Sequence, residues 1–317
     1  MSDIVLGVGA SHSTLMNTHW HEVAGIDRAE QFRAGLAEAN AAIVASEPDA
    51  VVIFGSNHFR GFWLDLMPAF TIGVGECTMS GESGTPEGPV EVDVALARHV
   101  LGSALAADFD LAFSTKLQVD HGISHAVQYL LDGIDVPIVP LVVNVFAPPL
   151  PSLARCDALG RVIGASIRAD GAVKRVVVIG SGGLSHTLPF PAWDVPRTDD
   201  ERFLVEAWTN GRENWRDYDP RRREIIRAAA PRTNAAFDEH VLDLVAAGRL
   251  AELGEWSDGA LVDEGGNGAH ELRAWILMAA VCGHAPGRTL VYSPMPEWLT
   301  GMGVALIDTP TTEECSA

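Results

Sequence analysis

The chain of 317 residues is 47% hydrophobic and 20% charged, a composition that excludes disorder for most of its length. Its 42 acidic and 22 basic residues give a net charge of −20, which repels phosphate backbones and anionic lipids, so we expect neither a nucleic acid nor a membrane as partner. The four cysteines lack C-x-x-C spacing, and we find neither a signal peptide nor an apolar run of about 18 residues, which favours a soluble protein of the reducing cytoplasm.

Short runs rich in valine and isoleucine predict strands that are buried on both faces, as in sheets covered by helices. In the first 185 residues these runs are 4–9, 50–54, 136–145 and 175–179. Apolar residues at helical spacing predict helices that alternate with them, over 28–46, 89–105, 124–131 and 156–168. This alternation predicts an α/β fold with a central, mostly parallel or mixed sheet flanked by helices.

The later part of the chain begins with a more polar region. Residues 199–249 contain tryptophan and arginine at helical periodicity, so we expect a mostly helical lobe at about 187–260. An amphipathic helix over 267–281 and late strands over 288–292 and 303–307 then return the chain to the sheet. We therefore expect a single α/β domain over residues 1–310, followed by a C-terminal tail over 311–317.

Several motifs fall short of the pattern they suggest. The glycines at 73–75 and 180–183 do not complete a dinucleotide fingerprint or a phosphate loop. Thr187 stands where a nucleophile elbow needs glycine, which disfavours a serine hydrolase. His270 begins a possible zincin helix, but Ala274 occupies the position of the second histidine.

Histidines follow three of the predicted strands: His12, His58 and His186. A single histidine is more often structural, but ligands of open α/β sheets bind at the carboxyl ends of strands, and the joint placement favours a shared site. Glu271 could add a carboxylate from an apolar helix face, although a solvated glutamate at a helix start explains it equally well. Two histidines and a carboxylate would form a facial triad for Fe(II), with three positions left open.

Six segments carry a resemblance to a known family. They are ASHSTL at 10–15, SNHFRGFWLDLMPAFTIGVG at 56–75, QVDHG at 118–122, GSGGLSH at 180–186, HELRAW at 270–275 and PMPEWLTGMG at 294–303. Together they run through nearly the whole chain in the family's order. On these residues the chain resembles the class III extradiol ring-cleavage dioxygenases, the superfamily of the protocatechuate 4,5-dioxygenase catalytic subunit.

The resemblance implies roles for five of these residues. It implies that His12, His58 and Glu271 are the metal ligands and that Fe(II) is the cofactor. It also implies that His121 and His186 are the catalytic acid–base pair, a task that suits imidazole because its pKa lies near neutrality. We assign His186 as the base and His121 as the acid, and a swap of the two stays open.

Three further residues are candidates near the substrate. Asp120 precedes His121 and either orients it or caps the following helix. His125 shares the helical face of His121 and is structural or lines the pocket. Arg60 is two residues after His58 and could provide the cation that a substrate carboxylate needs in so acidic a protein, or form a surface salt bridge.

The implied reaction is extradiol cleavage of a 3-substituted catechol that resembles 2,3-dihydroxyphenylpropionate. Both atoms of O2 would enter the product, a ring-opened semialdehyde or keto acid. The expected partners are the small aromatic diol, O2 and further copies of the chain in a homo-oligomer. Three alternatives stay open: the same reaction on protocatechuate, a 2-aminophenol or a bulkier catechol; a non-catalytic metal-binding relative; and a zinc hydrolase that uses the same histidines.

Overall fold

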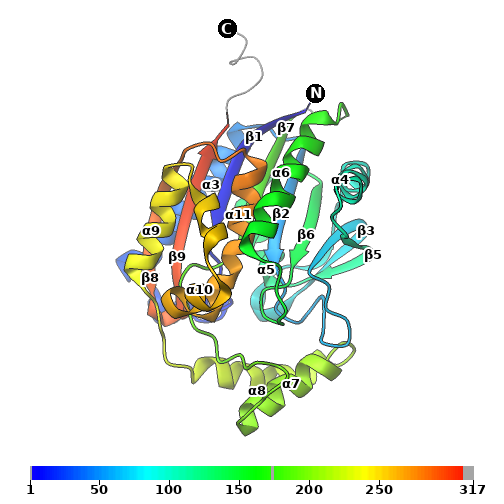
Figure 1. The fold of residues 1–317 in the computed structure, drawn as a ribbon. Helices are drawn as coiled ribbons and strands as arrows, with labels where there is room; N and C mark the ends of the chain where they lie inside the picture. Colours follow the sequence, from blue (N-terminus) through cyan, green and yellow to red (C-terminus); the bar gives the residue numbers. More distant parts are fainter. Residues whose placement is uncertain (1, 173–174, 310–317) are drawn as a thin grey trace.

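A computed structural model describes residues 2–172 and 175–309. These residues form a nine-stranded mixed sheet in the order β4-β3-β6-β2-β7-β1-β9-β8, with β5 paired to β3 outside this path (Figure 1). The strands are β1 (Asp3–Ala10), β2 (Ala50–Ser56), β3 (Phe70–Ser80), β4 (Glu87–Val90), β5 (Ala112–Val119), β6 (Ile138–Val143), β7 (Arg175–Ser181), β8 (Gly287–Met295) and β9 (Thr300–Asp308). The expected α/β fold with a mixed sheet is therefore confirmed.

Helices cover both faces of the sheet (Figure 1). One apolar core lies under α4 (Val94–Ala106), α6 (Leu153–Ala169) and α11 (Leu272–Val281), and the other under α3 (Asp27–Ala45) and α5 (His121–Leu130). The central strands β2 and β6 are buried along their whole length, because helices cover them on both sides. This double burial explains why their sequences are continuous apolar runs.

The remaining elements are short or lie at the margin. They are α1 (Leu15–Thr18), α2 (Trp20–Val23), α7 (Asp199–Asn210), α8 (Trp215–Arg227), α9 (Ala235–Ala246), α10 (Asp258–Gly265), and the 3-10 turns η1 (Glu82–Gly84), η2 (Leu250–Glu255), η3 (Asn267–Glu271) and η4 (Pro296–Trp298). Within the expected helical lobe, α7 and α8 lie below the sheet in Figure 1, whereas α9 packs on β8 and β9. The expected tail, 311–317, lies outside the described residues.

The structure differs from the expected elements in several places, among them α6, which begins at Leu153 rather than at residue 156. Strands β3, β4 and β5 were not predicted, and the helix expected from residue 89 begins at Val94, because Pro89 and Val90 still belong to β4. Helix α5 begins at His121 rather than at residue 124, since the side chain of Asp120 caps it by accepting a hydrogen bond from Gly122 N. The helix expected from residue 267 opens as the 3-10 turn η3.

The arrangement of three strands determines where a site can form. Strands β2, β7 and β1 are neighbours and run parallel, so that Gly55 pairs with Ser181 and Ser181 with Ala10. Their carboxyl ends therefore lie side by side at one edge of the sheet. The loops that leave this edge carry His12, His58 and His186, so the shared edge expected for the three histidines is present.

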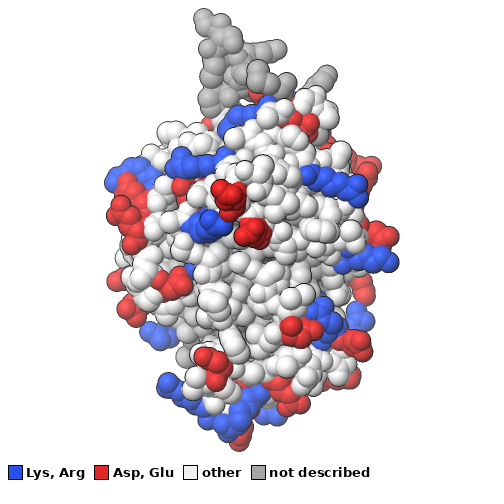
Figure 2. Space-filling model, turned by 45° about the vertical axis from the view of Figure 1, so that its right-hand side comes forward, with Lys and Arg blue, Asp and Glu red and all other residues white. Residues whose placement is uncertain are grey.

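The surface carries mixed charge. Figure 2 shows basic and acidic side chains interspersed on the face that it displays, with both concentrated at the lower end, where α7 and α8 lie. Across residues 2–172 and 175–309, no helix has the length and apolar character needed to cross a membrane.

Candidate active site

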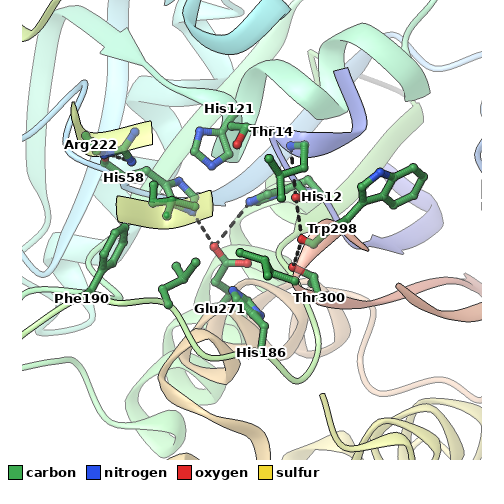
Figure 3. Close-up of a pocket in the computed structure, with 15 residues that line it drawn as sticks. His12, Thr14, His58, His121, His186, Phe190, Arg222, Glu271, Trp298 and Thr300 are labelled. Atoms are coloured by element: carbon green, nitrogen blue, oxygen red, sulfur yellow. Dashed lines mark hydrogen bonds and ion pairs between the residues drawn. The ribbon is translucent and has the colours of Figure 1, made fainter. Parts of the chain in front are cut away.

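A cavity opens at the carboxyl ends of β1, β2 and β7. All five residues expected as metal ligands or acid–base groups line it: His12, His58, His121, His186 and Glu271 (Figure 3). Each of these side chains is at least nine-tenths buried. The structure thus brings together residues that are up to 259 positions apart in the sequence.

Glu271 lies between two imidazoles. Its Oε1 is 2.7 Å from His58 Nε2 and 3.4 Å from His12 Nε2, as the dashed lines in Figure 3 show. Ser56 Oγ donates to the same oxygen at 2.9 Å, and the backbone N–H of Gly183 donates to Oε2. These contacts fix the carboxylate with one oxygen facing both ring nitrogens.

The far sides of both imidazoles are held as well. His12 Nδ1 is 2.9 Å from Ser181 Oγ, while its buried Nε2 has no hydrogen-bond partner among the described residues. His58 Nδ1 donates to Asp120 Oδ1 at 3.3 Å, and the backbone N–H of His58 donates to Oδ2 of the same carboxylate. A carboxylate at Nδ1 turns Nε2 toward the site and makes it a better metal ligand. Asp120 therefore caps α5, one of the two roles expected for it, and it orients His58 rather than His121.

The electrostatics of this group favour a cation. Burial lowers the pKa of His58, but Asp120 and then Glu271 outweigh that effect and raise the pKa to about 9. Burial likewise raises the pKa of Glu271, but His12 and His58 outweigh it and hold the pKa well below its usual range. A positive charge is thus stabilised where two ring nitrogens and a carboxylate oxygen meet. Two nitrogens and one oxygen are a donor set that suits divalent iron.

A second choice of three ligands exists at the same place. His12, His58 and His121 offer ring nitrogens within 4.8 Å of one another, and Glu82, Asp120 and His121 form another such group. The His121 ring stacks on the His58 ring with centroids 3.7 Å apart. The geometry alone therefore allows either His121 or Glu271 as the third ligand beside the two histidines.

His121 is held by Glu82, a residue that we did not predict. Its Nδ1 donates to Glu82 Oε1 at 2.7 Å, and its backbone N–H donates to the same oxygen at 3.2 Å. Because a carboxylate only accepts hydrogen bonds, Nδ1 carries the proton and Nε2 is left as the acceptor. Burial, followed by the charge of His58, lowers the pKa of His121 well below its usual range.

His186 is held by the backbone. Its Nδ1 donates to Leu184 O at 2.9 Å, which again leaves Nε2 as the acceptor. Its ring packs tightly against Gly268, where a Cβ would lie 2.1 Å from Cδ2 and Nε2. Burial is the main cause that lowers the pKa of His186. The preceding residue, Ser185, is fixed by Asp238, which accepts from its N–H at 2.7 Å and from its Oγ at 2.8 Å.

None of the three expected substrate contacts, Arg60, Asp120 and His125, lines the cavity. Arg60 is buried but is not a lining residue, since its Nη2 donates to Asp219 Oδ1 at 2.6 Å and its Nε is 3.4 Å from Glu82 Oε2. Phe59 has a φ of 61°, a left-handed turn between His58 and Arg60. His125 lines a separate small cavity behind His12, and neither of its ring nitrogens has a hydrogen-bond partner in the described part of the chain.

Sequence reasoning missed several residues of the cavity. Its apolar part is formed by Leu188, Phe190, Ile226 and Trp298, and it contains one buried guanidinium, that of Arg222. Arg222 stands in a run of three arginines, and nothing in that run distinguishes the buried member from its neighbours. Glu82 likewise lies in a polar loop segment without any motif.

Comparisons with known proteins agree with this site. A family model described as the catalytic LigB subunit of aromatic ring-opening dioxygenase matches residues 7–303. A 2,3-dihydroxyphenylpropionate/2,3-dihydroxicinnamic acid 1,2-dioxygenase of Rhodococcus jostii is 36% identical, over 93% of this chain and 95% of the relative. The protein of the same name from Paraburkholderia xenovorans is 36% identical over 84% of this chain and 87% of its own.

A solved structure of an uncharacterized protein from Escherichia coli K12 is similar over 96% of this chain and 99% of its own, with a TM-score of 0.44 and 15% identity, too remote to bear on function. The family match, in contrast, spans nearly the whole chain and includes every residue of the cavity. The resemblance seen in the sequence is therefore confirmed. The chain belongs to the LigB family of aromatic ring-opening dioxygenases and is an aromatic ring-cleaving dioxygenase.

Proposed function

We propose that this protein catalyses Fe(II)-dependent extradiol cleavage of a 3-substituted catechol whose side chain carries a carboxylate, with 2,3-dihydroxyphenylpropionate as the model substrate. The names of the relatives from Rhodococcus and Paraburkholderia support the substrate class. The observation that carries the reaction type is the carboxylate of Glu271 facing the Nε2 atoms of His12 and His58 in a buried cavity.

His12, His58 and Glu271 would hold the iron. His12 Nε2 supports this assignment: it lies 3.4 Å from Glu271 Oε1 but makes no hydrogen bond among the described residues, and a buried ring nitrogen without one is costly unless a ligand completes it. Asp120 supports it too, since it presents His58 through Nδ1 as carboxylates commonly do for metal-bound histidines. When bound, iron with this ligand set offers open coordination positions that a chelating catechol and O2 can share.

His186 and His121 would move protons. Both rings direct Nδ1 to an acceptor, so that Nε2 is the atom free to take a proton from a catechol hydroxyl. The partner of His186 is a neutral carbonyl, which suits a base that starts uncharged. The partner of His121 is the Glu82 carboxylate, which reduces the cost of an imidazolium that burial and the charge of His58 disfavour, and so suits the group that takes up a proton during turnover and returns it to oxygen. We therefore keep His186 as the base and His121 as the acid.

The test is oxygen consumption by protein loaded anaerobically with Fe(II). We expect one O2 taken up per 2,3-dihydroxyphenylpropionate cleaved, a yellow ring-opened product and, with ¹⁸O2, both labelled atoms in that product. Protocatechuate and a 2-aminophenol serve as alternative substrates. Turnover that continues without oxygen, or a product cleaved between the two hydroxylated carbons, would rule out the proposal.

A further inference from the structure

Beside the histidines and Glu271 the cavity borders a group of charged side chains from α8, from η1 and from the loop after β2. Five of them form a connected cluster: Arg60, Glu82, Asp219, Arg222 and Arg223. Three arginines thus share two carboxylates. Arg60 and Arg222 are 2% and 4% exposed, so water screens their charges little, whereas Arg223 is partly exposed.

The two carboxylates of the cluster lie closer to Arg60, Arg223 and His121 than to Arg222. Asp219 Oδ1 accepts from Arg60 Nη2 at 2.6 Å, and Asp219 Oδ2 lies 2.6 Å from Arg223 Nε. Glu82 uses Oε1 for His121, while Arg60 Nε lies 3.4 Å from its Oε2. Both oxygens of Asp219 and the Oε1 of Glu82 are therefore engaged at short distances by groups other than Arg222, whereas Glu82 Oε2 makes no hydrogen bond among the described residues and lies nearer to Arg60 than to Arg222.

Arg222 is left with loose contacts. Its Nη1 is 3.8 Å from Asp219 Oδ1 and 4.0 Å from Glu82 Oε2, and its Nη2 reaches His58 O only at 3.5 Å. The buried Nε has no hydrogen-bond partner among the residues that the structure describes. Of the cluster, only Arg222 lines the cavity (Figure 3). A buried, underpaired guanidinium at the wall of a substrate cavity is a site for an anion.

We propose that Arg222 binds the side-chain carboxylate of the substrate and thereby determines the preference for a charged 3-substituent. This inference rests on the proposed function, because it takes the catechol to be held at the histidines and Glu271. Phe190 and Ile226 line the same cavity and would contact the methylene groups between ring and carboxylate. The structure thus replaces Arg60, our expectation from the sequence, with a residue 162 positions later.

Two physical arguments support the assignment. Burial, and next the charge of Arg60, lower the pKa of Arg222 to about 10, so the folded protein holds this cation at a cost that an anionic ligand would offset. A guanidinium also offers a planar fork of donors that matches a carboxylate better than an ammonium group does. Since the chain as a whole carries a charge of −20, a local cation is needed for an anionic substrate to be favoured.

The test compares kcat/KM for 2,3-dihydroxyphenylpropionate with kcat/KM for 3-propylcatechol, in which a methyl group replaces the carboxylate. We expect the wild-type ratio to favour the propionate and to fall about 10–10²-fold in Arg222→Met, the range of a hydrogen bond to a charged group. The loss should fall on KM for the propionate, with KM for 3-propylcatechol changed little. Arg222→Lys should restore part of the ratio, since it keeps the charge but not the fork.

Arg223→Met is the matched control, because Arg223 is the next residue, binds the same Asp219 and does not line the cavity. Its ratio should equal that of the wild type. An unchanged ratio in Arg222→Met, or equal losses on both substrates, overturns the inference. If Arg222→Met does not fold, the wild-type protein still tests the inference. Equal kcat/KM for the propionate and its neutral amide would overturn it as well. Cleavage of neither catechol would instead refute the proposed function.

Discussion

Replacing Gly268 with alanine tests whether the position of His186 determines the rate. A Cβ at residue 268 would lie 2.1 Å from His186 Cδ2 and Nε2, whereas ordinary van der Waals contact begins at 3.4 Å. The imidazole would have to move by about 1.3 Å to relieve this overlap. The hydrogen bond from Nδ1 to Leu184 O, at 2.9 Å, would stretch or break in the process.

Misplacing a catalytic group by about 1 Å can cost about 10²-fold in rate, and a positioned acid or base contributes about 10²–10⁴-fold. We therefore expect Gly268→Ala to lower kcat per bound iron by about 10²-fold. Iron content should stay at the wild-type level, because His186 is not a proposed ligand. The overlap should also cost about 1–3 kcal/mol of stability, measured by urea unfolding.

Gly102→Ala is the control, since a Cβ there meets no atom within 4 Å and the residue lies on α4, away from the cavity. It should keep both kcat and iron. Wild-type turnover by Gly268→Ala would refute a role of the His186 position in the rate. So would a joint loss of iron and activity, because the change would then act through Glu271 at the end of the same turn.

Three further predictions concern buried ionisable groups. Burial raises the pKa of Asp238 from 3.8 to about 6, so the folded protein should lose up to about 3 kcal/mol of stability relative to Asp238→Asn as pH rises through that window. Urea denaturation of both proteins at pH 4.5 and 7.5 measures this loss, and a difference in unfolding free energy that is the same at both pH values contradicts it. Glu82→Gln should lower kcat per bound iron at least about tenfold with iron retained, because an amide stabilises the His121 imidazolium less than a carboxylate does; an unchanged kcat counts against the assigned role. Burial raises the pKa of Cys156 and Cys282 to about 12, so mass spectrometry should find both unmodified by iodoacetamide at pH 8 until denaturant is added; labelling of the native protein would contradict it.

The sequence predicted those parts of the fold in which local pattern and tertiary environment agree. Strands β2 and β7 are short apolar runs because helices cover them on both faces, and this burial is visible in composition alone. Strand β5 was missed because most of its residues are partly or fully exposed, so that no apolar run marks it. In β3, Gly73 and Gly75 interrupt the pattern, since a Cβ on Gly75 would lie 2.5 Å from Thr115 O on the neighbouring strand.

The site was predictable to the extent that its residues follow strands or family motifs. His12 and His58 come directly after β1 and β2, and strand ends are where α/β folds bind ligands. Glu82 and Arg222 were not predictable, because the burial of a charged side chain is decided by partners far away in the sequence. Arg60 was wrongly predicted for the same reason. It is close to His58 in the sequence, but Asp219 and Glu82 hold its guanidinium away from the cavity.

Iron stoichiometry in five single alanine variants separates the proposed metal ligands from the proposed acid–base pair. We expect alanine at His12, His58 or Glu271 to lower bound iron and turnover together, since each removes one of three protein bonds to the metal. Alanine at His121 or His186 should leave about one iron per chain and remove most of the turnover. Iron that is lost from His121→Ala but kept by Glu271→Ala would contradict the account, because the metal would then be held by three histidines.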